Sequence, residues 1–142
     1  LKALPMLAKA AENPQLKQAL THHREETEGQ VERLQKVFEA LGKRARATTC
    51  EAINGLIEEG DDVVESFEAG PVRDAALIAC AQAVEHYEMA RYGALIAWAK
   101  VGGHKDIVAP LQQTLDEEKK ADTLLNQLAN ENVNKQATQK AA

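Results

Sequence analysis

The chain has 142 residues, which is the length of one ordinary domain, and we expect a single domain over residues 1–142. Hydrophobic residues make up 44% and charged residues 27%, and the net charge is −5, a balance typical of a soluble globular protein. The acidic charge without a long basic run argues against a nucleic-acid partner, and no apolar run approaches the ~20 residues of a membrane-spanning helix. Cys50 and Cys80 lack metal-ligand spacing, so we expect two packing residues in a reducing, cytoplasmic setting.

Helix signals dominate the chain, and strand alternation is nearly absent. Asn13 and Pro14 form an N-cap followed by a proline in the first helical turn, while Gly42 and the pair Gly102-Gly103 end helical patterns. The expected helices span residues 1–12, 15–41, 50–68, 72–101 and 105–130.

Three features qualify these expected helices. Residues 1–12 have the pattern of the end of a helix that starts before Leu1. Pro110 removes a helical hydrogen bond, so we expect the regular part of the last helix to begin near Ala109, after a separate short turn. The tail over 132–142 is polar, and we expect it to be frayed.

The connections between these helices indicate the fold. Two hairpins with short turns are joined by a long crossover that carries its own short helix. This arrangement predicts an all-α, ferritin-like four-helix bundle with an extra helix in the crossover.

In three of the helices, residues taken in alternating steps of three and four form a stripe along one face, which we call the seam. Each seam is apolar at both ends and polar in the middle. Burying carboxylates in such a stripe costs several kcal/mol per ion unless something compensates. The polar interruptions are His23, Glu26 or Thr27, and Gln30 in the first seam, Glu85 and Glu88 in the second, and Glu118 and Asp122 in the third.

The interruptions lie at similar depths in the bundle. Glu88 lies 14 residues before Gly102 and Glu118 lies 14 residues after His104, so both are about 21 Å from the same turn. Glu26 lies 12 residues beyond Pro14, about 18 Å from the opposite turn. The matching level on the first helix falls at or just before Leu1.

Several carboxylates at one level repel each other, and two divalent cations would compensate. Carboxylate oxygen with a little imidazole suits iron or manganese better than zinc. No Glu-x-x-His occurs in the chain, His23 could equally be a satisfied core histidine, Gln30 could simply hydrogen-bond a carboxylate, and Glu117 is expected to face solvent. The predicted metal residues are His23, Glu26, Glu85, Glu88, Glu118 and Asp122.

Four segments, which include most of these residues, resemble the YciF/YciE-like bacterial stress proteins. They are His22-His-Arg-Glu-Glu-Thr-Glu-Gly-Gln30, Val72-Arg-Asp-Ala-Ala-Leu-Ile78, Val84-Glu-His-Tyr-Glu88 and Thr114-Leu-Asp-Glu-Glu-Lys-Lys-Ala-Asp122. The resemblance covers essentially the whole chain. It implies a ferritin-like bundle with a di-iron site, expression under stress, a cytoplasmic location and a homodimer.

The resemblance also implies which positions face the metal. These are Glu26, Glu85, Glu88 and Glu118, with His23, Gln30 and Asp122 nearby. Relatives begin earlier, and their first helix carries a Glu a few residues before the position of Leu1, so two Fe or Mn ions per chain are expected if that residue is present.

Two functions of different classes follow. The leading hypothesis is a stress-response protein with a ferritin-like di-metal carboxylate site that handles peroxide, dioxygen or iron. The alternative is a non-enzymatic, dimeric helical interaction module, in which the polar layer of the seams specifies helix pairing at a cost in stability.

Overall fold

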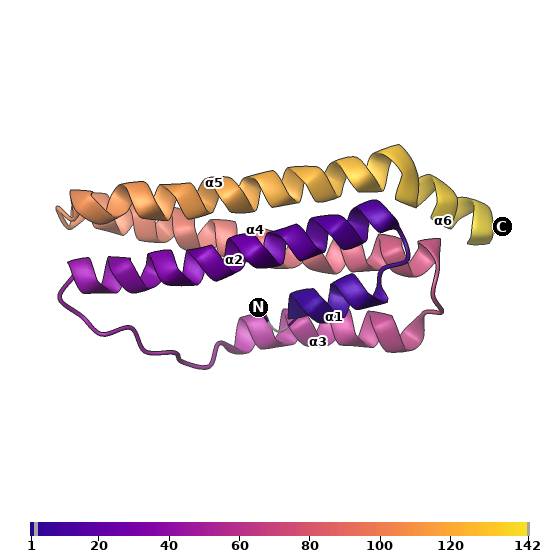
Figure 1. Cartoon of the computed structure of the whole chain (residues 1–142), viewed down its shortest axis with the longest axis horizontal. Helices are drawn as coiled ribbons and strands as arrows, with labels where there is room; N and C mark the ends of the chain where they lie inside the picture. Colours follow the sequence, from indigo (N-terminus) through magenta and orange to yellow (C-terminus); the bar gives the residue numbers. More distant parts are fainter. Residues whose placement is uncertain (2, 142) are drawn as a thin grey trace.

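The protein is all-helical in a computed structural model that describes Leu1 and residues 3–141 (Figure 1). No strand occurs within this part of the chain, so the all-α prediction is confirmed. In chain order the elements are α1 (Ala3–Ala10), α2 (Pro14–Ala40), α3 (Glu51–Ser66), α4 (Pro71–Val101), α5 (Lys105–Leu128), the π-helical turn η1 (Ala129–Val133) and α6 (Asn134–Ala141).

Three long helices, α2, α4 and α5, run along the long axis of the molecule (Figure 1). The short helix α1 packs on α2, and α3, carried by the crossover between α2 and α4, packs on α4 and touches α1. The observed order is therefore two helical hairpins with a helix in the crossover, as predicted. Because α1 has 8 residues against 27 in α2, it covers only part of the length of its partner.

Local signals set the helix ends close to their predicted positions. The side chain of Asn13 accepts hydrogen bonds from the backbone N–H groups of Gln15 and Leu16 at 2.9 and 3.0 Å, and Pro14 occupies the first turn of α2. Gly42 (φ 64°) and Gly103 (φ 78°) adopt the left-handed conformation that ends α2 and α4, where other side chains would be strained.

A tertiary contact also holds the turn between α1 and α2. Asp74, buried at the start of α4, accepts hydrogen bonds from the backbone N–H groups of Glu12 and Asn13, both at 2.8 Å. Its neighbour Arg73 donates to the carbonyl of Ala10 at 2.7 Å. These hydrogen bonds connect the first hairpin to the second, and no local sequence pattern predicts them.

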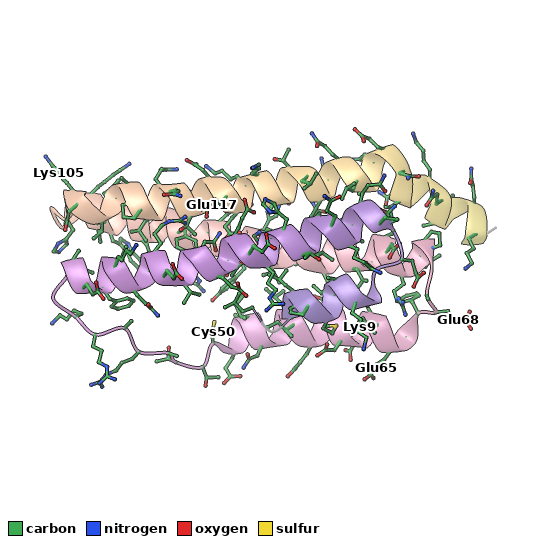
Figure 2. All side chains as sticks on the ribbon, in the orientation of Figure 1. Lys9, Cys50, Glu65, Glu68, Lys105 and Glu117 are labelled. Atoms are coloured by element: carbon green, nitrogen blue, oxygen red, sulfur yellow. The ribbon has the colours of Figure 1, made fainter. Side chains whose placement is uncertain are left out.

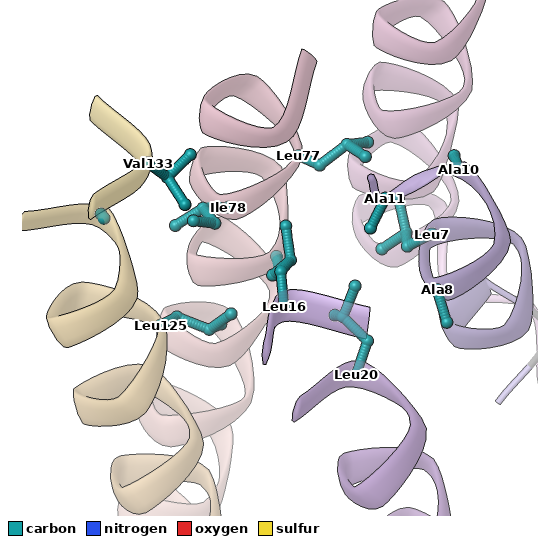
Figure 3. Packing of buried hydrophobic residues seen from close by; sticks show 12 residues of the cluster. Leu7, Ala8, Ala10, Ala11, Leu16, Leu20, Leu77, Ile78, Leu125 and Val133 are labelled. Carbon is teal, nitrogen blue, oxygen red and sulfur yellow. The ribbon is translucent and has the colours of Figure 1, made fainter. Parts of the chain in front are cut away.

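The apolar core consists of two clusters, one toward each end of the bundle. The end nearer the α1–α2 turn, drawn in Figure 3, includes Leu16 and Leu20 of α2, Ile78 of α4 and Leu125 of α5. The other end is formed by Val37, Tyr92, Ile96, Ala99, Ile107, Leu111 and Leu115. On each long helix the polar stretch predicted from the seams lies between the two clusters.

Two predictions about the end of the chain were wrong. Pro110 lies inside α5, which begins at Lys105 without a separate turn. The proline leaves the carbonyl of Asp106 without its helical partner, but Asp106 is exposed and water can bond to that group.

The tail is likewise not frayed, because it continues as η1 and α6 and packs against α4. Val133, at the end of η1, is only 1% exposed and belongs to the first apolar cluster. Val133, the largest apolar side chain of this polar segment, anchors the tail.

Among the described residues, no helix combines the length and the apolar character needed to cross a membrane.

Candidate metal centre

Three buried side chains from three helices meet between the two apolar clusters. They are His23 of α2, Glu85 of α4 and Glu118 of α5, which are 7%, 2% and 0% exposed. His23 Nε2 lies 3.1 Å from Glu85 Oε1 and 3.4 Å from Glu118 Oε2, and one nitrogen or oxygen from each residue lies within 4.8 Å of the others. Three such groups around one point offer the kind of donor set that a divalent cation needs.

The polar atoms of this centre lack partners. Both oxygens of Glu118, Oε2 of Glu85 and Nδ1 of His23 are buried without a hydrogen bond. Leaving buried polar atoms unpaired costs free energy, and buried carboxylates are ordinarily paired or bound to metal. Iron or manganese would satisfy the orphaned oxygens and accept imidazole nitrogen as well, so the residues present fit such an ion.

The charges point the same way. Burial raises the pKa of Glu118 well above the usual range of a carboxyl, and the carboxylates of Glu85 and Glu88 raise it further. Burial and the charge of Glu85 also raise the pKa of Glu88, although His23 opposes them. Burial lowers the pKa of His23, but the carboxylates of Glu85 and Glu26 outweigh it and leave that pKa raised. The acidic groups of this centre therefore cannot all be ionised together unless a cation is bound. Without a cation, some of them hold protons.

A second polar group lies beside the centre, and it corrects a prediction. Glu117 is not solvent-facing: Arg33 donates to both its oxygens at 2.9 and 2.8 Å, and Gln30 donates to one of them at 3.2 Å. Arg33 also donates to Thr114 at 2.6 Å. Burial alone would raise the pKa of Glu117, but the hydrogen bond from Arg33 and those from Gln30 and Gln113 bring it below its usual value.

The other three predicted metal residues, Glu26, Glu88 and Asp122, lie outside the group formed by His23, Glu85 and Glu118. Glu88 is half-buried one turn beyond Glu85 and close enough to act on the pKa of Glu118. Glu26 lies on the outer side of His23, with its Oε2 3.5 Å from His23 Nδ1. Asp122 accepts a hydrogen bond from Gln82 at 3.0 Å and lies 3.2 Å from His86, away from the three central groups.

Two cavities reach the centre from different sides. One, of about 40 Å³, lies between α2 and α5 and is lined by His22, Glu26 and Lys120 among others. The second, of about 90 Å³, lies between α1, α2, α3 and α4 and is lined by Glu88 among others. Both cavities are lined by His23 and Glu85, and neither is lined by Glu118.

The cysteines lie away from this centre. Cys80 is buried, as expected for a packing residue, whereas Cys50 is exposed at the start of α3, where its label stands in Figure 2. Its Sγ lies 3.2 Å from the hydroxyl of Tyr87, and the pKa of its thiol is lowered first by that hydroxyl and then by the N–H of Ile53. The prediction that Cys50 is a packing residue was therefore wrong.

Comparison with known proteins places the chain in a family. Residues 1–138 match the family model described as "Domain of unknown function (DUF892)". The chain belongs to the DUF892 family. Within it, the chain is 48% identical to Protein YciF of Escherichia coli (strain K12) over 141 residues, which are 99% of this chain and 85% of that protein.

Two solved structures are also similar to this DUF892 protein. One is the crystal structure of the E. coli stress protein YciF, with 48% identity and a TM-score of 0.89 over 94% of this chain and 85% of that chain. The other is YcfI, a putative structural protein from Rhodopseudomonas palustris, with 53% identity and a TM-score of 0.86 over 88% of this chain and 80% of that chain. The family resemblance predicted from the sequence is confirmed.

Proposed function

We propose that this DUF892 protein is a ferritin-like bundle acting in bacterial stress defence, with a buried centre that binds iron or manganese. One observation carries the proposal: Glu118 has no exposed surface, neither of its oxygens is hydrogen-bonded, and it faces Glu85 and His23. A buried carboxylate in that position costs stability unless a cation or a proton compensates it.

The ligand set follows from the burial and the distances. His23, Glu85 and Glu118 would hold the first ion. A second ion, as in a di-metal centre, would use Glu88, one turn beyond Glu85. The ions, when bound, would supply redox chemistry toward peroxide or dioxygen.

The protein side chains have separate tasks in this proposal. With an ion bound, Glu85 and Glu118 would carry negative charge in a buried position, and His23 would supply one imidazole nitrogen. Glu117, which is held by Arg33, accepts a hydrogen bond from Gln30 and would keep that side chain in place. The apolar clusters on both sides keep the three long helices at a constant spacing.

Elemental analysis of the purified protein tests the proposal. We expect at least about one equivalent of iron or manganese per chain, and loss of most of it in Glu118→Ala, because metal affinity depends on the number of deprotonated ligands. Glu25→Ala is the matched control, since Glu25 is a glutamate of α2 with a 72% exposed side chain. Less than about half an equivalent in the wild type, with no loss in Glu118→Ala, would refute the metal centre.

A second candidate is a non-enzymatic, homodimeric interaction module. Large apolar side chains on the C-terminal part of α4 support it, because Leu95, Trp98 and Val101 are 39%, 68% and 91% exposed. In that case the chain would melt at the same temperature with and without chelator. Light scattering would detect the dimer, and a dimer would also exclude a ferritin-like storage cage.

A further inference from the structure

The two nitrogens of His23 face different carboxylates. Nε2 faces inward, 3.1 Å from Glu85 and 3.4 Å from Glu118, whereas Nδ1 faces Glu26 at 3.5 Å. The nitrogens lie on opposite edges of the ring. A carboxylate that meets Nδ1 therefore lies behind the imidazole as seen from an ion held at Nε2.

Each oxygen of Glu26 lies near a histidine nitrogen on this outer side. Its Oε2 is the one near His23 Nδ1, and its Oε1 lies 3.5 Å from Nε2 of the exposed His22. Neither oxygen belongs to the group of donor atoms formed by His23, Glu85 and Glu118. The side chain is 21% exposed, compared with 72% for its neighbour Glu25, so Glu26 is held at the edge of the centre.

Glu26 is placed to accept a hydrogen bond from the unpaired Nδ1 of His23. That nitrogen is buried and has no hydrogen bond, and the Glu26 carboxylate is the acidic group that faces it. A shift of about 0.3 Å would bring the pair within ordinary hydrogen-bond distance. Histidines that bind a metal through one nitrogen usually donate the other N–H to a carboxylate, a backbone carbonyl or water, which fixes the ring and the tautomer.

We propose that Glu26 is a positioning residue for His23 and not a metal ligand. It accepts the Nδ1–H of His23, holds the ring with Nε2 toward Glu85 and Glu118, and thereby makes the centre ready for an ion. This role rests on the proposed metal centre. It differs from the role that the family resemblance implies for the same position, which is that of a ligand facing the metal.

Titration of the metal-free protein with Mn²⁺, followed by electron paramagnetic resonance of the free ion, separates the two roles. We expect Glu26→Ala to bind the same number of ions as the wild type with about 10–100-fold weaker affinity. Glu26→Gln, whose amide oxygen can still accept the Nδ1–H, should restore affinity to within about threefold of the wild type. Glu25→Ala, on the same helix, should match the wild type.

Two results would overturn the positioning role. If Glu26→Gln binds as weakly as Glu26→Ala, or if either variant binds fewer ions, then Glu26 is a ligand. If Glu26→Ala binds as tightly as the wild type, then Glu26 does nothing for His23. Equal thermal melting of the three metal-free variants would show that altered folding causes none of these differences, and absence of Mn²⁺ binding by the wild type would refute the metal centre itself.

Discussion

Replacing Glu118 by glutamine should change how the stability of the metal-free protein responds to pH. Burial and the charges of Glu85 and Glu88 raise the pKa of Glu118 from its ordinary value of 4.5 to about 10. A carboxyl whose pKa is raised in the folded state binds a proton there that the unfolded chain has already released. Its contribution is fully present below pH 4.5 and is lost as the pH rises toward the folded-state pKa.

The magnitude follows from linkage. One proton of difference changes the free energy of unfolding by about 1.4 kcal/mol per pH unit. Between pH 5 and pH 7 the wild type should therefore lose up to about 2.7 kcal/mol through this one group, which is about 8 °C in melting temperature for a chain of this size. Glu118→Gln keeps the size of the side chain and removes the titration, so its stability relative to the wild type should rise by the same amount.

Urea unfolding in excess chelator at pH 5, 6 and 7 measures this difference. Glu25→Gln serves as the control, since its exposed side chain should follow the wild type at every pH. Addition of Mn²⁺ at about 100 times its dissociation constant should stabilise the wild type by about 2.7 kcal/mol and leave Glu118→Gln nearly unchanged. A gap between Glu118→Gln and wild type that stays constant to within about 0.5 kcal/mol from pH 5 to pH 7 would refute the burial argument.

Three further predictions concern other parts of the molecule. Asp74→Ala should destabilise the protein by about 2–5 kcal/mol, because two backbone N–H groups lose a buried carboxylate acceptor, and an unchanged urea midpoint would contradict this. Arg33→Met leaves Glu117 without its bidentate partner, so unfolding in urea should show a loss of about 1–3 kcal/mol at pH 7. Because the pKa of Glu117 is lowered in the folded state, this loss should shrink as the pH falls below 4.5, and a loss that is undiminished well below that pH would contradict the ion pair. Iodoacetamide at pH 8 should modify the exposed Cys50 much faster than the buried Cys80, whose thiol pKa is raised by burial, and equal rates by mass spectrometry would be evidence against the described environments.

Much of the fold could be predicted from local features. Asn13 and Pro14 start α2 where the sequence placed it, and Gly42 and Gly103 end helices because their φ angles require glycine. The apolar periodicity predicted three long helices with polar middles, and the structure has an apolar cluster on each side of that layer. The tail was predicted wrongly, because one residue, Val133, outweighs the polar character of its neighbours by entering the core.

For the candidate metal centre, the amino-acid sequence alone determined how far along the bundle each polar residue lies. The tertiary structure decided toward which neighbour each side chain points. A helix rises about 1.5 Å per residue whatever its surroundings, so counting from the turns placed Glu26, Glu88 and Glu118 at similar depths. In the structure Glu118 meets Glu85 and His23 instead, each three residues along the helix from one of the counted positions. Each residue also turns the side chain by about 100°, and the rotation of each helix about its own axis depends on all its neighbours. Only the packed structure could therefore direct Glu26 to the outer edge of His23 and pair Glu117 with Arg33, which lies 84 residues away.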